Sequence, residues 1–159
     1  MEEIVELLRK KKKTISTMES CTGGGVANDI TNIEGASDVL KYSAVTYSNE
    51  YKIKMGVSDK VIKKFSVYSI ETAHEMAKNI SLFAKATMGI GITGKLNRAD
   101  QNNNFGKDNE VFISIYYKHK FYDMSVNVDK KTRKLNKDVI IDLIIQKVGE
   151  ILWEEKLIK

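Results

Sequence analysis

Proline is absent from this chain of 159 residues, and cysteine occurs only once. Proline usage averages about 5% in proteins, so the loops here form without the residue that most often presets a turn. The single thiol, Cys21, excludes an intramolecular disulfide framework and any metal site built from several thiolates. This cysteine usage fits a reducing compartment.

Long apolar runs are also missing. No segment approaches the roughly 18 apolar residues that a membrane span requires. The first residues, MEEIVELLRKKKK, carry charge from the second position and lack the apolar core of a signal peptide. We therefore expect a cytoplasmic protein with no membrane partner.

Arginine is scarce although the chain is basic. The net charge is +5, but only three of the 26 basic residues are arginines, namely Arg9, Arg98 and Arg133. Nucleic-acid readers rely on arginine, whose planar fork matches phosphates and base edges, so this excess of lysine argues against a nucleic-acid partner. Hydrophobic and charged residues make up 42% and 30% of the chain, which is typical of a folded globular protein. The length favours one domain over residues 1–159.

Hydrophobic periodicity predicts an alternation of helices and strands. The expected helices cover residues 2–12, 26–33, 58–65, 69–86 and 131–153. Strands are expected over 14–18, over the second half of 38–49, over 88–93, and in a hairpin of 111–117 with 121–128. This order predicts an α/β fold, a three-layer α/β/α single domain with a mixed β-sheet. Residues 94–109 are polar and aperiodic, as functional or disordered loops are.

The segment ESCTGGG, residues 19–25, joins the first strand to the second helix. Glycines let the backbone approach a ligand and adopt positive φ, and the helix start offers free N–H groups to an anion or an oxyanion. A tight turn with a Ser or Thr helix cap explains the same pattern equally well. The pattern alone leaves both interpretations open.

Several segments occur in an order that resembles a known family. They are TMESCTGGGVANDIT, EGAS, VTYSNEYK, MGV, VYSIETAHEMA and GITG, running from about Thr14 to Gly94 with a weaker match up to the last helix. Together they resemble the carboxy-terminal domain family of CinA. The best-known activity of that family is nicotinamide mononucleotide deamidase.

The resemblance implies hydrolysis of the carboxamide of nicotinamide mononucleotide to nicotinate mononucleotide and ammonia. It implies a small-molecule nucleotide as the binding partner and no metal or organic cofactor. It also implies a homo-oligomer, a dimer or larger. Chemistry of this kind needs a nucleophile, a base, an oxyanion stabiliser and an anchor for the phosphate.

Ser20 matches the serine of the family and is the expected nucleophile. A serine hydroxyl needs an adjacent base, and neither His74 nor His119 is placed for that role, since both are expected at the surface. Within VTYSNEYK the resemblance offers Lys52 and Tyr47 as catalytic residues. Which of the two is the base stays open, because a lysine can act only if its surroundings disfavour the ammonium.

Other positions match residues that the resemblance assigns to substrate binding. Cys21, beside the expected nucleophile, is a rival because thiols are intrinsically better nucleophiles. Arg133 is expected to clamp the phosphate, although a shifted alignment would give that role to Lys134. The expected substrate-binding residues are Thr22, Gly23, Gly24, Ser37, Thr93, Gly94 and Arg133.

The chain departs from the family pattern after Gly94. The family continues with a glycine- and proline-containing loop, whereas here Lys95 begins the segment KLNRADQNNNFGKDN. If this loop shapes the substrate pocket, the pocket differs. The alternative function is therefore a catalytically impaired, pyridine-nucleotide-binding homologue with a rewritten 95–109 loop.

Overall fold

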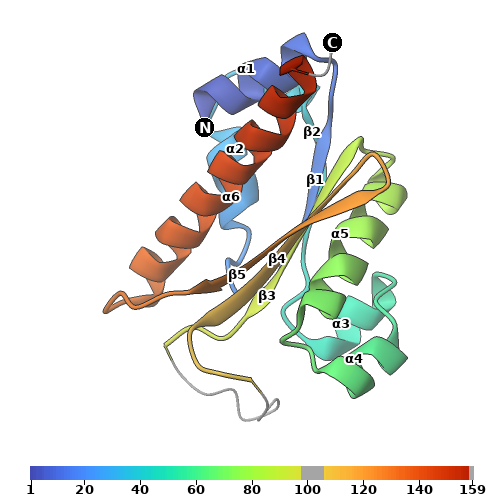
Figure 1. Cartoon of the computed structure of the whole chain (residues 1–159), viewed down its shortest axis with the longest axis vertical. Coiled ribbons are helices and arrows are strands. Elements are labelled where there is room, and N and C mark those ends of the chain that lie inside the picture. The colour runs from blue at the N-terminus through green and yellow to red at the C-terminus, as the bar shows by residue number, and fades with distance from the viewer. Residues whose placement is uncertain (98–105, 158–159) are drawn as a thin grey trace.

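The sheet contains five strands in the order β2-β1-β3-β4-β5. Figure 1 shows the computed structural model of the chain, in which residues 1–97 and 106–157 are described. The parallel strands β1 (Ile15–Glu19), β2 (Leu40–Val45) and β3 (Met88–Gly94) lie on one side of the sheet. The antiparallel strands β4 (Glu110–Tyr117) and β5 (Lys120–Asn127) complete it. The sheet is therefore mixed, as predicted.

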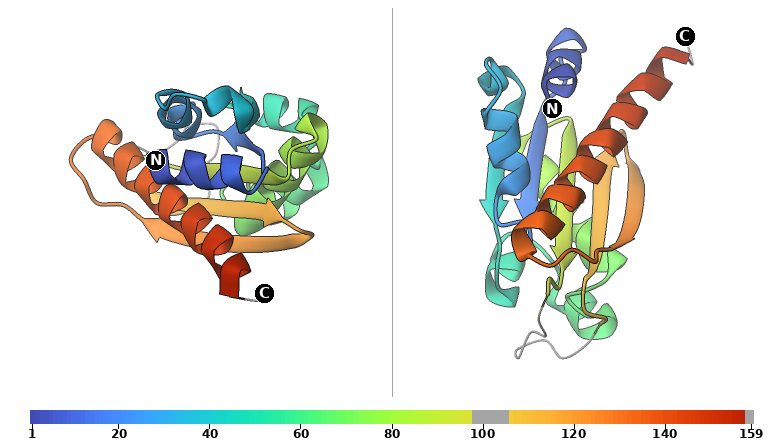
Figure 2. Two further views of the ribbon diagram at one scale, coloured as in Figure 1. Left: turned by 90° about the horizontal axis from the view of Figure 1, so that it is seen from above. Right: turned by 90° about the vertical axis from the view of Figure 1, so that its left-hand side faces the viewer.

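Helices cover both faces of this sheet (Figures 1 and 2). One face carries α1 (Glu2–Lys10), α2 (Gly25–Thr31) and α6 (Arg133–Leu157), whose apolar residues share the larger core cluster with β1, β3 and β4. The opposite face carries α3 (Asn49–Lys54), α4 (Asp59–Phe65) and α5 (Ile70–Ala84), beneath which a smaller cluster forms around Met18, Met76 and Ile80. The expected three-layer α/β/α architecture is confirmed.

Glycines in β3 let α5 lie unusually close to the sheet. A Cβ on Gly91 would approach the backbone oxygen of Ala73 to 2.3 Å, a separation that no side chain tolerates. The start of α5 is fixed by Ser69, whose hydroxyl accepts a hydrogen bond of 3.2 Å from the Thr72 amide. The strand and the helix both lie where the sequence predicts them, within residues 88–94 and 69–86.

The structure differs from the prediction chiefly between residues 36 and 54. The expected strand is shorter, because a 3₁₀ turn η1 (Ala36–Asp38) precedes β2 and the strand ends at Val45. Residues 49–54 form helix α3, which the pattern did not reveal. Residues 98–105 of the expected loop lie outside the described residues. In the described ranges, no helix combines the length and the apolarity that crossing a membrane requires.

Candidate functional site

Three parallel strands end at the same edge of the sheet, which is where open α/β sheets commonly bind ligands. Ser20 directly follows β1, Tyr47 lies two residues beyond β2, and Thr93 and Gly94 end β3. The register pairs Glu19 with Val45 on one side and with Ile92 on the other, so Ser20 lies next to Thr93. Segments that are far apart in the sequence thus meet around Ser20.

Ser20 and Lys52 form a buried pair at this edge. The Nζ atom of Lys52 donates to the Ser20 Oγ at 3.0 Å and to the Thr46 carbonyl oxygen at 2.7 Å. Only 7% of Ser20 and 2% of Lys52 are exposed. Helix α3 positions the lysine, and the hydroxyl of Ser48 caps that helix by accepting from the Tyr51 amide at 3.2 Å. A hydroxyl and an amine are thereby held in hydrogen-bond contact away from bulk water.

Glu19 organises the turn that follows Ser20. Its buried carboxylate accepts from the Thr22 hydroxyl at 2.6 Å and from the amides of Val26 and Ala27 at 3.1 and 3.0 Å. These amides belong to the first turn of α2, so Glu19 serves as the cap of that helix. Of the two interpretations that the sequence left open, the capped turn describes the Val26 and Ala27 amides, although the capping group is the Glu19 carboxylate and not a Ser or Thr hydroxyl.

The predicted binding residues of the turn are held in different ways. The Thr22 hydroxyl proton is engaged by Glu19, so that hydroxyl already has its acceptor. Gly23 and Gly24 have φ values of +63° and +89°, which explains why glycine occupies both positions. A Cβ on Gly23 would lie 3.3 Å from the Lys137 Nζ, so a lysine from α6 reaches this turn.

Cys21, the rival nucleophile, is buried among the elements of the site. Burial raises the pKa of its thiol to about 12, and the smaller opposing effect of nearby Lys52 does not offset it. Because the thiolate is the reactive form, the thiol stays unreactive near neutral pH. Burial of the thiol therefore favours Ser20 over Cys21 as the candidate nucleophile.

Tyr47 and Arg133 meet above the edge of the sheet. The Nη2 of Arg133 donates to the Tyr47 hydroxyl at 3.0 Å, and its Nη1 donates to the carbonyl oxygen of Leu96. The guanidinium thus spans from the end of β3 to the end of β2. Lys134 instead binds Asp138 at 2.9 Å, which raises the pKa of the lysine. Of the two candidates at this helix start, Arg133 is the one that contacts another residue of the candidate site.

Thr93 and Gly94 lie at the same edge but are tightly packed. The Thr93 hydroxyl is buried and donates to the Val67 carbonyl at 2.8 Å. A Cβ on Gly94 would come within 2.7 Å of the Glu110 backbone oxygen. Both residues therefore shape the edge through their packing.

Ser37 is not brought to this site. It is exposed within η1, just before β2 begins, and the register pairs the start of β2 with the start of β1. Ser20 follows the opposite end of β1. Within one chain, the structure therefore separates Ser37 from the remaining expected site residues.

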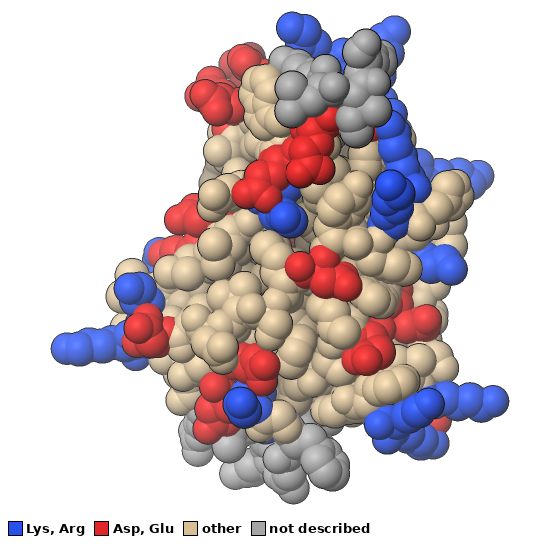
Figure 3. All heavy atoms as spheres, viewed as in Figure 1, with Lys and Arg blue, Asp and Glu red and all other residues tan. Residues whose placement is uncertain are grey.

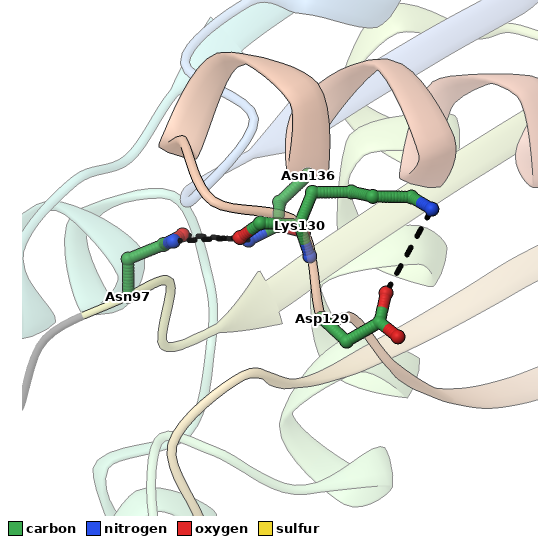
Figure 4. A network of polar contacts seen from close by, with 4 residues as sticks. All are labelled: Asn97, Asp129, Lys130 and Asn136. Carbon is green, nitrogen blue, oxygen red and sulfur yellow. Dashed lines mark hydrogen bonds and ion pairs between the residues drawn. The ribbon is translucent and has the colours of Figure 1, made fainter.

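Three side chains near the site escaped sequence reasoning. Asn97 accepts from the Nδ2 of Asn136 at 2.7 Å and donates to the Lys130 carbonyl at 3.1 Å (Figure 4). This network ties the segment after β3 to the start of α6. The third side chain is Lys95, which is buried, with an exposed fraction of only 5%. The asparagines of the polar segment were the sequence signal that could have indicated this network. Nothing in the sequence distinguishes Lys95 from the other lysines, of which the chain has 23 in all.

His74 is partly exposed, in keeping with its expected place at the surface, and it takes part in a polar cluster there. Its Nε2 lies 2.7 Å from Asp123, and its ring stacks on Phe121 with centroids 4.2 Å apart. The Ser114 hydroxyl donates to the same Asp123 at 2.9 Å. Asp123 thus binds both side chains, and the cluster joins α5 to β4 and β5.

The described residues contain no group of three or more His, Cys, Asp or Glu side chains suited to a metal ion. On the face shown in Figure 3, the lysines and arginines lie mainly around the outline, with acidic side chains between them. No continuous basic surface is visible on that face. The absence of a nucleic-acid partner stays a prediction.

Comparisons with known proteins agree on one family. A family profile described as the CinA C-terminal domain matches residues 1–150. A CinA-like protein of Flavobacterium psychrophilum is 36% identical over 155 residues, covering 96% of this chain and 35% of the relative. A CinA-like protein of Kosmotoga olearia is 49% identical over 94 residues, covering 58% of this chain and 23% of the relative. The chain thus spans about a third or less of these relatives.

Solved structures show the same fold. A CinA superfamily protein from Klebsiella pneumoniae superposes with a TM-score of 0.89 at 19% identity, covering 96% of this chain and 95% of the other. A second, from Escherichia coli, gives a TM-score of 0.86 at 20% identity, covering 94% and 89% of the two chains.

Proposed function

The chain belongs to the CinA C-terminal domain family, and on that premise we propose that it hydrolyses the carboxamide of nicotinamide mononucleotide. The observation that carries the proposal is the buried contact of 3.0 Å between the Lys52 Nζ and the Ser20 Oγ. Nucleophile and base must lie within hydrogen-bond reach of each other. The products are nicotinate mononucleotide and ammonia.

Lys52 is the proposed base. Removal of an ammonium from water favours its neutral form, and a neutral amine can take the proton of Ser20. Tyr47 is instead exposed, and its hydroxyl accepts from Arg133. This contact suits Tyr47 to orient Arg133 or the substrate.

The proposed reaction has two steps. The Ser20 Oγ bonds to the amide carbon while its proton passes to Lys52, and the tetrahedral intermediate then expels ammonia after the leaving nitrogen receives that proton. Water next attacks the resulting ester, Lys52 takes a proton from it, and Ser20 leaves as a hydroxyl. Backbone N–H groups of the turn after Ser20 are the proposed donors for the oxyanion. Those of Gly23 and Gly25 donate within the turn, and those of Val26 and Ala27 are bound to Glu19.

Arg133 supplies a cation for the substrate phosphate. It lies close enough to Cys21 to lower the pKa of that thiol slightly, although burial dominates. An arginine presents several donors in a fixed fork, which suits phosphate oxygens. Its contacts with Tyr47 and Leu96 fix its orientation before substrate arrives.

The test is ammonia release from nicotinamide mononucleotide by the purified chain. We expect turnover between pH 6 and 9, and a loss of at least about 1,000-fold in Ser20→Ala, because residual catalysis after loss of a nucleophile is small. Ser125→Ala, which alters an exposed serine on β5, should leave the rate within about twofold. Absence of turnover in folded wild-type protein contradicts the proposal, and tight nucleotide binding without turnover favours the impaired homologue.

A further inference from the structure

Lys95 is a buried cation without a carboxylate partner among the described residues. Only 5% of it is exposed, and its Nζ lies 3.5 Å from the Gly106 carbonyl oxygen. The ring centroid of Tyr68 is 5.2 Å from the same atom. Burying a charged group without a partner of opposite charge is costly. The long contact with the Gly106 carbonyl and the contact with the Tyr68 ring together compensate for only part of that cost.

Lys95 lies at the same edge of the sheet as Ser20. Met18 and Gly91 both face α5, and side chains on one face recur every second residue. By this alternation Thr93 shares that face, and it donates to Val67 just before α5. Ser20 and Lys95 directly follow β1 and β3, and Lys95 reaches Tyr68, which also lies just before α5. Lys95 lies two residues beyond Thr93, roughly 7 Å farther along the strand direction.

We propose that Lys95 binds a phosphoryl oxygen of the substrate that Ser20 attacks, and so makes the site prefer a nucleotide to the corresponding nucleoside. The inference rests on the proposed function for the identity of the substrate. A pyridine nucleotide carries the amide at one end and the phosphate at the other, with the ribose between them. A cation displaced along the strand from the nucleophile suits the phosphate end.

The backbone around Lys95 is held in place by contacts on both sides. Gly94 precedes it without room for a Cβ, and the Leu96 carbonyl accepts from Arg133. Asn97 is fixed by Asn136 and by the Lys130 carbonyl (Figure 4). Lys95 therefore begins a short segment after β3 whose next two residues are held by Arg133 and by the Asn136 network.

A purely structural role for Lys95 and a role in ligand binding predict different effects of Lys95→Met on stability. If the lysine serves only to hold Gly106 and Tyr68, Lys95→Met lowers the midpoint of urea unfolding. If it serves a ligand, the apolar side chain of similar length removes a buried charge and leaves the midpoint unchanged or higher. Lys120→Met provides the control, because Lys120 is exposed at the far end of the hairpin.

Calorimetry with nicotinate mononucleotide and with nicotinate riboside tests the proposal directly. For Lys95→Met we expect the dissociation constant of the nucleotide to rise roughly 10- to 100-fold, as for a lost hydrogen bond to a charged group. The nucleoside, which lacks the phosphate, should bind within about twofold of wild type. Equal losses for both ligands, no loss for either, or no binding of the nucleotide to wild type would overturn the assignment.

Turnover separates this inference from the proposed function. If wild type releases no ammonia but its affinity for the nucleotide still depends on Lys95, the proposed hydrolysis is wrong and the anion site stands. If wild type releases ammonia and Lys95→Met changes the KM by less than about threefold, the anion site is wrong and the hydrolysis stands.

Discussion

At the scale of single residues, the candidate site depends on the burial of one lysine. Lys52 is one of 23 lysines, yet helix α3 directs it inward to Ser20 and Thr46 while its neighbour Lys54 stays exposed and pairs with Glu50. A buried amine that contacts a hydroxyl can serve as a base or as a fixed positive charge. The two roles predict different behaviour on substitution.

Lys52→Arg separates these roles, because an arginine keeps the charge and does not deprotonate in proteins. If Lys52 is the base, both Lys52→Arg and Lys52→Met should lower kcat by at least about 100-fold, which is the lower range of general base catalysis. The measurement is steady-state ammonia release, with unfolding midpoints to confirm folding. Lys54→Met is the matched control and should retain the wild-type rate; substantial activity in Lys52→Arg would show that only the charge is needed.

The order of the motifs and their resemblance to the family identified Ser20 and Lys52 from the sequence. The burial of Lys52 and the distant position of Ser37 were not predicted, for physical reasons. Ser20 and Lys52 match motif positions, but burial of Lys52 depends on contacts between segments that periodicity does not describe. Ser37 lies close to the other motifs in sequence, yet the parallel pairing of β1 with β2 carries it to the opposite end of the sheet. Matching motifs by their order along the chain takes no account of the fact that Ser20 follows its strand whereas Ser37 precedes its own.

At the scale of elements, long periodic segments were predictable and short ones were not. Helices α5 and α6 repeat their apolar positions over several turns, whereas α3 has only six residues and follows a strand directly. Periodicity needs about eleven residues to become clear. The cap of α2 was equally hidden, because Gly24 at the N-cap offers no side chain and Glu19 acts from the preceding strand.

Glu19→Gln tests this remote cap. The amide side chain retains one oxygen but turns donors toward the Thr22 hydroxyl or the α2 amides, so we expect the free energy of unfolding to fall by about 1–3 kcal/mol. Urea denaturation measures the change, and Glu34→Gln, at an exposed position, should alter it by less than about 0.5 kcal/mol. Equal stability of Glu19→Gln and wild type would mean that the carboxylate does not hold α2.

At the scale of the whole molecule, Glu155 joins three parts of the chain away from the candidate site. Its carboxylate, near the end of α6, accepts from the Tyr117 hydroxyl of β4 at 2.8 Å and from Lys11 after α1 at 3.4 Å, and it also pairs with Lys118. Burial raises the pKa of Glu155, but these hydrogen bonds, with that of Lys118 the largest, together lower it to about 2. The ionised carboxylate therefore helps to fasten α6 across the sheet.

The pH dependence of stability follows from the sign of this shift. The folded pKa of about 2 lies below the unfolded value of 4.5, so the contribution of Glu155 is fully present above pH 4.5 and is lost as the pH falls toward 2. Urea midpoints of wild type and Glu155→Gln should differ most at pH 6–7 and converge as the solution is acidified. Glu154→Gln, at the exposed neighbouring position, should show no such convergence. A gap between wild type and Glu155→Gln that persists unchanged below pH 3 would show that the ionised carboxylate is not the source of the stability, and that the packing of this side chain holds α6 instead.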